Sequence, residues 1–271
     1  MSKIRLSSDA PIIGCLIMLA VFIWLRDTTW ISSSDDTLPI LVAIPLFIWI
    51  GSPWHFKDNP ETPSLGWIAL TAFLFLVGIA INSTLLLTLS WCALLWAWLS
   101  KKVTNESLPT LKKLMILPLM AFPWISLDAD RIGWWFRLSG AWTTAQFFSL
   151  LGLDVKQEGT LLNVNGLPIS VEVACAGLNT LQSMLIAGSV VAFLILGDTK
   201  RYWVNLPLLV VMAWVANTLR IILISAAALL ITPAFSKGNF HVFGGWVVIM
   251  LMFCLCWFIF SLQEPKEPQN R

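Results

Sequence analysis

The sequence predicts an all-α polytopic membrane protein, and two properties of the chain support this fold class. Of the 271 residues, 58% are hydrophobic and only 12% are charged, and the mean hydropathy is +0.80. A soluble domain carries roughly 25% charged residues. The apolar residues also gather in runs long enough for helices, separated by short polar segments. We therefore expect one integral membrane domain that crosses a bilayer about eight times, at ~20 residues per span.

The apolar runs mark the expected transmembrane helices, although several are shorter than the ~20 residues that span a bilayer. The first run has no small-residue cleavage site after it and is followed by further runs, so we expect a retained helix instead of a signal peptide. The runs are residues 11–25, 38–51, 65–81, 85–99, 114–127, 176–196, 203–231 and 242–262.

Lysine and arginine in the short loops predict the orientation of these helices. When the spans alternate in direction, the basic loops fall on one side, and an excess of basic residues marks the cytoplasmic side of a membrane. That side holds the N-terminus with Lys3 and Arg5, Lys57, residues 101–113, the Lys200-Arg201 turn and the tail 263–271. The outer side holds residues 27–36, the Asn82 turn, residues 128–174 and residues 233–240. The chain is thus divided into N-terminal helices (1–127), an outer segment (128–174), catalytic helices (175–262) and a cytoplasmic tail (263–271).

The outer segment has two expected parts. Residues 131–151 contain several Trp and Phe residues among polar ones, which is typical of an amphipathic helix in the membrane interface. Residues 160–164 and 167–173 then flank the pair Asn165-Gly166. An Asn-Gly pair between two runs of β-forming residues predicts a β-hairpin, whose second strand would lead to Cys175. An irregular loop is the alternative.

One cysteine differs from the others in its position. The five cysteines are irregularly spaced, which gives neither a disulfide framework nor a C-x-x-C metal pair. Cys175 alone lies at the edge of an apolar run, where a polar segment meets the start of a helix. The first turn of a helix carries unpaired N–H groups and a partial positive charge, which favour the nucleophilic thiolate over the thiol.

A polar stripe follows this cysteine. Asn179, Gln182 and Ser183 come four, seven and eight residues after Cys175, so all of them share one helix face. Asn179 and Gln182 are therefore candidate supporting or substrate-binding residues. The alternative is that these amides only form hydrogen bonds between helices.

Arg220 lies inside an apolar run, where an arginine costs ~2.5–3.5 kcal/mol or more at the bilayer centre and marks a functional site by default. It follows Trp203 by 17 residues, which is roughly 25 Å of helical rise in a hydrocarbon layer ~30 Å thick. Arg220 is therefore expected near the outer boundary, at the level of Cys175. Asn217 shares its helix face and is a further candidate supporting residue. The alternative is an arginine that extends outward to lipid headgroups.

His241 opens the last expected helix, directly after the outer loop. The other histidine, His55, belongs to a cytoplasmic loop, so His241 is the one histidine expected on the outer side. Gly244 and Gly245 follow it, and glycines at such positions allow close contact between helices. A surface or capping role is the alternative for a lone histidine.

Cys175, Arg220 and His241 are thus expected at one membrane face, and together they suit nucleophilic acyl transfer. The histidine would accept the thiol proton and later donate it to the leaving group. The arginine would stabilise the oxyanion of the tetrahedral intermediate, or orient a substrate carboxylate or backbone carbonyl. Glu172 is a candidate to orient His241, and equally a solvated strand residue.

The composition argues against several other kinds of partner. Cys175 and His241 alone would make a poor metal site, so neither a metal nor another cofactor is expected. The net charge of +2, without a basic stripe, argues against nucleic acid. The expected surroundings are the lipid bilayer itself.

Three short blocks around the candidate residues resemble the exosortase/archaeosortase family of membrane-embedded cysteine transpeptidases. Residues 164–181 (VNGLPISVEVACAGLNTL) are similar to the family's strand running into an A-C-S/T-G-L motif. Residues 216–221 (ANTLRI) are similar to its A-N-x-x-R-I motif, and residues 240–246 (FHVFGGW) to its H-x-x-x-G-W motif. The order and spacing of the blocks match as well, whereas the earlier helices match only as generic apolar spans.

The resemblance implies that Cys175, Arg220 and His241 are the catalytic residues. Ala176 stands where many members have Ser or Thr, and this departure affects substrate or subtype rather than the chemistry. Val173 stands where an acidic residue is common, with Glu172 displaced by one position, so the resemblance gives Glu172 no role.

The resemblance further implies a bacterial sorting enzyme of the cytoplasmic (inner) membrane, with its active site facing outward. Its partners would be exported proteins that end in a short motif such as Pro-Glu-Pro, a transmembrane helix and a basic cluster. The enzyme would cleave near the motif through a Cys thioester and transfer the protein to a cell-surface acceptor. The basic end of the substrate would stay cytoplasmic.

Two other functions fit parts of the pattern. In a transporter of an anionic solute, Arg220 and Asn217 would bind the solute and substitution of Cys175 would be tolerated, but the paired broken-helix repeat of such proteins is missing. A noncatalytic assembly protein for envelope polysaccharide or protein export would tolerate the loss of any one of the three residues.

Overall fold

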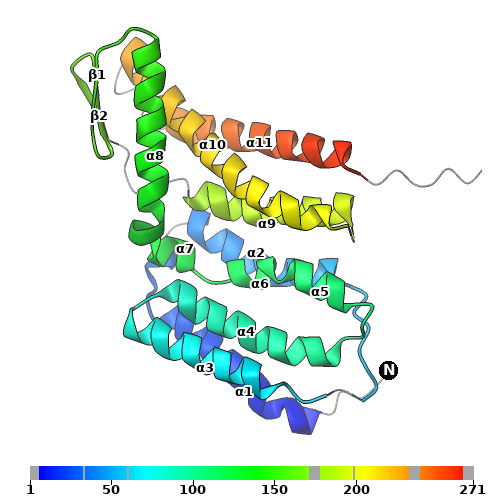
Figure 1. Cartoon of the computed structure of the whole chain (residues 1–271). Coiled ribbons are helices and arrows are strands. Elements are labelled where there is room, and N and C mark those ends of the chain that lie inside the picture. Colours follow the sequence, from blue (N-terminus) through cyan, green and yellow to red (C-terminus); the bar gives the residue numbers. More distant parts are fainter. Residues whose placement is uncertain are drawn as a thin grey trace, which may run out of the picture. The chain divides into compact units, whose positions relative to one another are not determined.

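A computed structural model describes residues 6–32, 34–59, 61–170, 178–197, 199–231 and 239–264, and most of these residues are helical (Figure 1). The chain forms two compact units, residues 1–128 and 129–271. The described part of the first unit is built from helices, and that of the second combines helices with one small sheet.

In the first unit, the helix α4 packs against α1, α3, α6 and α7. The elements are α1 (Leu6–Leu25), η1 (Thr29–Ser32), α2 (Ser34–Ile50), α3 (Leu65–Ala80), α4 (Thr84–Lys102), α5 (Leu108–Leu114), α6 (Ile116–Met120) and α7 (Trp124–Leu127). Indole N–H groups join distant helices: Trp91 Nε1 donates to the carbonyl oxygen of Leu16 (2.8 Å), and Trp24 Nε1 donates to that of Ala121 (3.0 Å). Such bonds give buried indole groups a partner inside the protein, which matters where no water is present.

A buried carboxylate closes the turn between α3 and α4. Asn82 adopts a left-handed conformation (φ 55°), which the short polar side chain of asparagine tolerates. Asp128 accepts hydrogen bonds from Ser83 Oγ (3.1 Å) and from the backbone N–H groups of Thr84 (3.3 Å) and Leu85 (2.8 Å). These backbone groups belong to the first turn of α4, where a negative charge also meets the positive end of the helix dipole. Asp128 therefore caps a helix that begins far from it in the sequence.

The prediction of a single helix over residues 114–127 is wrong. These residues are distributed over the end of α5 and the short helices α6 and α7. Proline has no N–H to donate and is best tolerated in the first turn of a helix. Pro118 lies in the first turn of α6, and Pro123 directly precedes α7. The prolines thus divide an apolar run into helices too short to be spans.

In the second unit, three long helices pack together and a fourth runs crosswise to them (Figure 1). α10 is in contact with α8, α9 and α11, and α9 is also in contact with α11. The elements are α8 (Ala129–Leu150), β1 (Val155–Glu158), β2 (Leu161–Val164), β3 (Leu167–Ser170), α9 (Leu178–Leu196), α10 (Arg201–Leu230) and α11 (Asn239–Leu262). The crosswise direction of α8 fits the predicted helix in the membrane interface.

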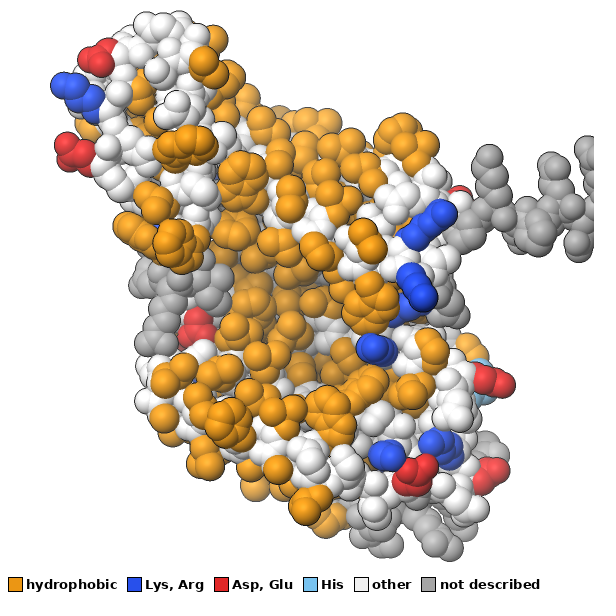
Figure 2. Space-filling view, in the orientation of Figure 1, with side chains coloured by type: hydrophobic (Ala, Val, Ile, Leu, Met, Phe, Trp, Pro, Cys, Tyr) orange, Lys and Arg blue, Asp and Glu red, His pale blue; other side chains and the backbone are white. Residues whose placement is uncertain are grey.

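Several of the described helices have the length and composition of membrane spans. In the described residues, three helices are long and apolar enough to cross a membrane: α4, α10 and Phe243–Leu262 of α11. Shorter apolar helices cover Asp9–Leu25, Thr37–Ile50, Leu65–Ala80 and Thr180–Leu196. Apolar side chains cover much of the surface visible in Figure 2, as lipid contact requires. These features are those of a polytopic membrane protein, whereas the number of about eight spans stays a prediction.

A small antiparallel sheet follows α8, with the strand order β1-β2-β3. β2 and β3 lie in the two segments for which a hairpin was expected, and the chain turns between them at Asn165 (φ 51°) and Gly166 (φ 83°). Two successive positive φ values are those of a type I′ turn, whose twist matches that of the strands. β1 was not expected, because its sequence VKQE contains a single strong β-former.

The inner face of the sheet packs against α8 and α10. One hydrophobic cluster contains Ala141, Ala145 and Phe148 of α8, Leu162 and Val164 of β2, and Ile221 of α10. Because Ile221 directly follows Arg220, this cluster attaches the sheet to the part of α10 that carries the candidate site residues. Residues 171–173, expected to extend the second strand of the hairpin, lie outside the described residues.

Polar pairs join the helix ends that are predicted to face the cytoplasm. In the first unit, Lys102 Nζ lies 2.6 Å from Asp9 Oδ2, which links α4 to α1. In the second unit, Asn205 Nδ2 donates to Gln263 Oε1 (2.8 Å), which links α10 to the end of α11. Each unit therefore has a polar connection between helices that are distant in the sequence.

Replacing Asp128 by alanine should lower the thermal unfolding midpoint of the purified protein in detergent. The variant removes the acceptor of three hydrogen bonds at the start of α4, and the loss of a helix cap costs about 1 kcal/mol. Asp154→Ala is the matched control, because the Asp154 side chain is exposed. Equal midpoints for the two variants would contradict the capping role of Asp128.

Candidate active site

The candidate residues of α10 lie on a stripe that faces its neighbours α9 and α11. Leu209, Ala213, Asn217 and Arg220 recur at spacings of three or four residues, so they share one helix face. Leu209, Ala213 and Asn217 are buried, and Arg220 is half-buried. The face thus changes from apolar to polar toward the end of α10 that is predicted to lie outward.

The guanidinium group of Arg220 packs against a glycine of α11. A methyl group on Gly245 would lie 3.1 Å from Arg220 Nε and 3.5 Å from Arg220 Cζ. The missing side chain at position 245 therefore leaves the room that the guanidinium group occupies. At Gly244, the preceding residue, a methyl group would have no atom of the described residues within 4 Å. Of the two adjacent glycines, therefore, only Gly245 lies against the Arg220 side chain.

This contact brings Arg220 close to the turn of α11 that contains position 241. Residue 241 lies in α11, four residues before Gly245. Residues four apart on a helix share a face and are separated by about 6 Å along the axis. The arginine and the histidine position therefore occupy one layer of the helix group, although nothing is described of the His241 side chain itself.

The start of α9 lies in the same layer. A methyl group on Gly188 would collide with the side chain of Leu209, so α9 and α10 are closely packed at these residues. The two helices run in opposite directions after a short turn (Figure 1). Leu178 precedes Gly188 by ten residues and Arg220 follows Leu209 by eleven, which gives about 15 Å and about 17 Å of rise toward the same end. Cys175 lies outside the described residues, three positions before Leu178 in the chain.

A buried amide lies one turn before Arg220. The Asn217 side chain is 1% exposed, and neither its Nδ2 nor its Oδ1 has a hydrogen-bond partner among the residues that the structure describes. An unpaired buried polar group costs about 1–3 kcal/mol. A ligand that brings both a donor and an acceptor, such as a peptide group, would satisfy both ends of this amide.

The two polar candidates of α9 have different surroundings. Gln182 is 2% exposed and has an interaction within the protein. This environment fits hydrogen bonding between helices, the alternative to a role in substrate binding. Asn179 belongs to the first turn of α9, and its side chain is outside the described part of the structure.

α8 adds contacts to this region that the sequence did not predict. Trp214 Nε1 of α10 donates a hydrogen bond to Ser139 Oγ (2.9 Å). A methyl group on Gly140 would lie 3.7 Å from Thr218 Oγ1 of α10. α8 therefore packs directly against the polar part of α10. The small residues Ser139, Gly140 and Ala141 in the middle of α8 were the available sign, because small residues allow helices to approach closely.

Arg220 brings a positive charge to a region that has few charges. The helices α9, α10 and α11 contain no Asp or Glu, and Arg201, at the opposite end of α10, is their one other Lys or Arg. A fixed charge acts strongly where the dielectric constant is low. Within the described residues, no group of three His, Cys, Asp or Glu side chains could hold a metal ion.

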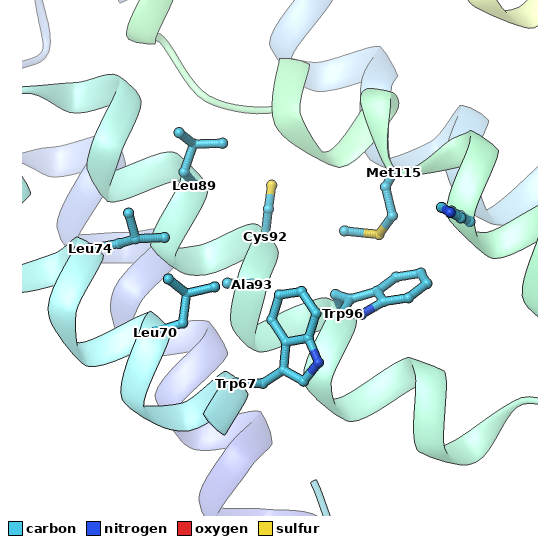
Figure 3. A pocket seen from close by; sticks show the side chains of 9 residues that line it. Trp67, Leu70, Leu74, Leu89, Cys92, Ala93, Trp96 and Met115 are labelled. Atoms are coloured by element: carbon cyan, nitrogen blue, oxygen red, sulfur yellow. The ribbon is translucent and has the colours of Figure 1, made fainter. Parts of the chain in front are cut away.

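A surface groove of the first unit has a different character (Figure 3). It has a volume of about 310 Å³ and lies between residues of α3, α4 and α5. Its lining consists of Trp67, Leu70, Leu74, Leu89, Cys92, Ala93, Trp96, Lys112 and Met115. This lining contains neither a histidine nor a carboxylate, so the groove offers no acid–base pair for acyl transfer.

These features define a membrane protein in which an arginine and a histidine position share one layer, next to the helix that follows a cysteine. Comparison with known protein families matches residues 12–258 to the family described as Transmembrane exosortase. The chain belongs to this family. The resemblance of the three motifs is therefore confirmed at the family level, and the match also extends over the N-terminal helices that had looked generic. No curated protein and no solved structure matches the chain.

Asn217→Leu should leave the thermal unfolding midpoint in detergent unchanged or raise it, because leucine removes an unpaired buried amide at similar volume. Asn205→Leu on the same helix is the matched control. Asn205 is also buried (3% exposed), but its Nδ2 donates to Gln263 Oε1 and to the carbonyl oxygen of Arg201. Its replacement should cost about 1–2 kcal/mol of stability. Equal destabilisation by both variants would show that Asn217 has a structural partner.

Proposed function

We propose that this transmembrane exosortase is a cysteine transpeptidase or protease that cleaves the C-terminal sorting signals of exported proteins at the outer face of the cytoplasmic membrane. The observation that supports the proposal is the packing of Arg220 against Gly245, one helical turn from position 241. The start of α9, which follows Cys175 in the chain, lies in the same layer. Acyl transfer by cysteine requires a nucleophile, a proton carrier and a group that stabilises the oxyanion.

In the proposed reaction, the Cys175 thiolate attacks the carbonyl carbon of the scissile peptide bond. His241 has accepted the thiol proton, and it donates this proton to the leaving amine as the C–N bond breaks. Arg220 stabilises the negative oxygen of the tetrahedral intermediate. The resulting thioester is then attacked by an amine of a cell-surface acceptor, or by water. His241 takes the proton of this second nucleophile, and Cys175 leaves as the thiolate.

The polar residues around this trio have supporting roles in the proposal. The amide of Asn217 would pair with a peptide group of the substrate next to the reacting carbonyl. Asn179 would support the nucleophile from the first turn of α9. Gln182, which is buried, would hold the helices that carry the trio.

The proposed substrates are exported proteins that end in a short motif, a transmembrane helix and a basic cluster. The substrate helix would lie in the bilayer against the apolar surface of α11, where Phe243 (70% exposed) and Trp246 (60% exposed) point away from the protein interior. The basic cluster would remain on the cytoplasmic side, because positive charge is retained there. The motif would then emerge at the outer face beside the candidate site.

A transporter of an anionic solute is the second candidate function, because Arg220 and the unpaired Asn217 amide would also suit an anion. A transporter would need Arg220 but not Cys175, whereas the proposed transpeptidase needs both residues.

Cys175→Ala should abolish processing of a reporter that carries the host's own tripartite C-terminal tail. The variant has no nucleophile, so the immunoblot should show a shortened reporter with the wild-type protein and the full-length reporter with Cys175→Ala or without the protein. The variant must reach the membrane in wild-type amounts. Normal processing by Cys175→Ala would exclude the proposed chemistry. Unchanged processing together with complete loss in Arg220→Gln would favour a role of Arg220 that does not involve Cys175.

Gly245→Ala should slow processing about ten- to hundredfold, because the added methyl group displaces the Arg220 guanidinium group and small shifts of a catalytic group have effects of this size. Gly244→Ala is the matched control, since its methyl group meets no atom within 4 Å and should leave the rate within a factor of about two of wild type. The first-order rate of reporter shortening is measured by pulse-chase. Equal rates for the two variants would mean that the position of Arg220 does not matter for processing.

A further inference from the structure

We propose that the free edge of β3 binds the segment of the substrate outside the membrane as an added strand of the sheet. This inference rests on the proposed function and names the surface on which the segment to be cleaved is held. An extended peptide that adds to a sheet edge gains affinity from main-chain hydrogen bonds, largely independently of its sequence.

The register of the sheet identifies the backbone groups that β3 directs outward. β3 pairs with β2 on one side, and in the described residues no strand pairs with its other side. Val164 and Leu167 flank the two-residue turn and therefore exchange both hydrogen bonds. Because bonding alternates along an antiparallel pair, Leu167 and Ile169 bond to β2, whereas Pro168 and Ser170 direct their backbone groups to the open side.

Pro168 fits this assignment. A proline in a sheet is tolerated at an edge position whose N–H would point away from the neighbouring strand. Pro168 therefore costs no bond between β2 and β3. The open side presents the carbonyl oxygens of Pro168 and Ser170 and the N–H of Ser170.

The opposite edge of the sheet is protected, whereas the β3 edge carries no charge. β1 has the exposed charged residues Lys156 and Glu158, and charges on an edge strand discourage pairing with another chain. The sequence of β3 is LPIS, which contains no charged residue. Of the two edges, β3 is therefore the one open to a peptide.

β3 is also the edge that leads to the proposed nucleophile. Ser170 precedes Cys175 by five residues, a chain length of at most about 18 Å. The sheet is also fixed to α10, because Leu162 and Val164 of β2 share a hydrophobic cluster with Ile221, the neighbour of Arg220. A peptide paired with β3 would therefore be held on a sheet that is fixed to α10, the helix that carries Arg220.

Disulfide cross-linking tests the added strand directly. Pro168→Cys and Ser170→Cys are each combined with Cys175→Ala, which prevents turnover, and a single cysteine is moved through the extracytoplasmic segment of the reporter. After oxidation of isolated membranes, each variant should cross-link mainly to one reporter position. The two partner positions should differ by two residues, because opposed residues in a sheet keep a fixed register.

Asn163→Cys is the matched control for these variants. Asn163 pairs with Pro168 on the same face of the sheet, but belongs to the central strand β2. A strand added beyond β3 would lie about 10 Å from position 163, outside the 4.4–6.8 Å Cα separation of a disulfide. Cross-linking of all three variants to the same spread of reporter positions, or of none of them, would overturn the proposal.

A second measurement uses the active protein. Ser170→Pro removes the outward N–H, whereas Ser170→Ala keeps it, so the first variant should process the reporter about five- to tenfold more slowly than the second. If both process it at the wild-type rate in a Cys175-dependent reaction, docking at β3 is wrong while the proposed function stands. If wild-type protein does not process the reporter, the proposed function fails and the inference fails with it.

Discussion

Holding the permanently charged guanidinium group of Arg220 between apolar helices is the constraint on which the second unit depends. Such a charge is costly inside a bilayer, and none of α9, α10 and α11 contains a carboxylate that could neutralise it. The packing of the helices gives the guanidinium group a defined place. Gly245 gives the guanidinium group room in α11, and the close packing of Gly188 on Leu209 fixes the relative depth of α9 and α10. The charge is thereby held near the end of the helix group, where water, lipid headgroups or a substrate can reach it.

The outer segment is built onto the same part of α10, so it is more than a loop between spans. α8 contacts α10 at Trp214 and Thr218, and the sheet shares its core with Ile221. These three residues lie on the side of α10 that faces α8, whereas Asn217 and Arg220 lie on the side that faces α9 and α11. One stretch of a single helix thus joins the sheet to the charged layer. A change in the position of this stretch would move the sheet and Arg220 together.

The sequence was sufficient where a local rule decides the structure. The Asn165-Gly166 pair predicts a tight turn, and the structure has the two positive φ values that such a turn requires. It was insufficient where the structure depends on distant contacts. The carboxylate of Asp128 caps a helix that begins more than forty residues earlier, and no local pattern announces such a bond. Two adjacent glycines look equivalent in the chain, and only the rotation of α11 against α10 makes Gly245 the one that Arg220 needs. In the fifth apolar run, composition suggested a span, and the sequence did not distinguish its prolines from those that α2 and α10 hold within one helix.

The amide of Asn217, which has no hydrogen-bond partner among the described residues, is the feature of the architecture that a ligand would complete. In the interior of a membrane protein no bulk water satisfies polar groups, so an amide with two unpaired ends is more costly than an apolar residue of the same size. Its neighbours do not require it: the stripe continues with Leu209 and Ala213, which pack without polar partners. A ligand that offers a donor and an acceptor in one group would satisfy both ends of this amide. A peptide bond is such a group, and the proposed function would bring a peptide to this part of α10.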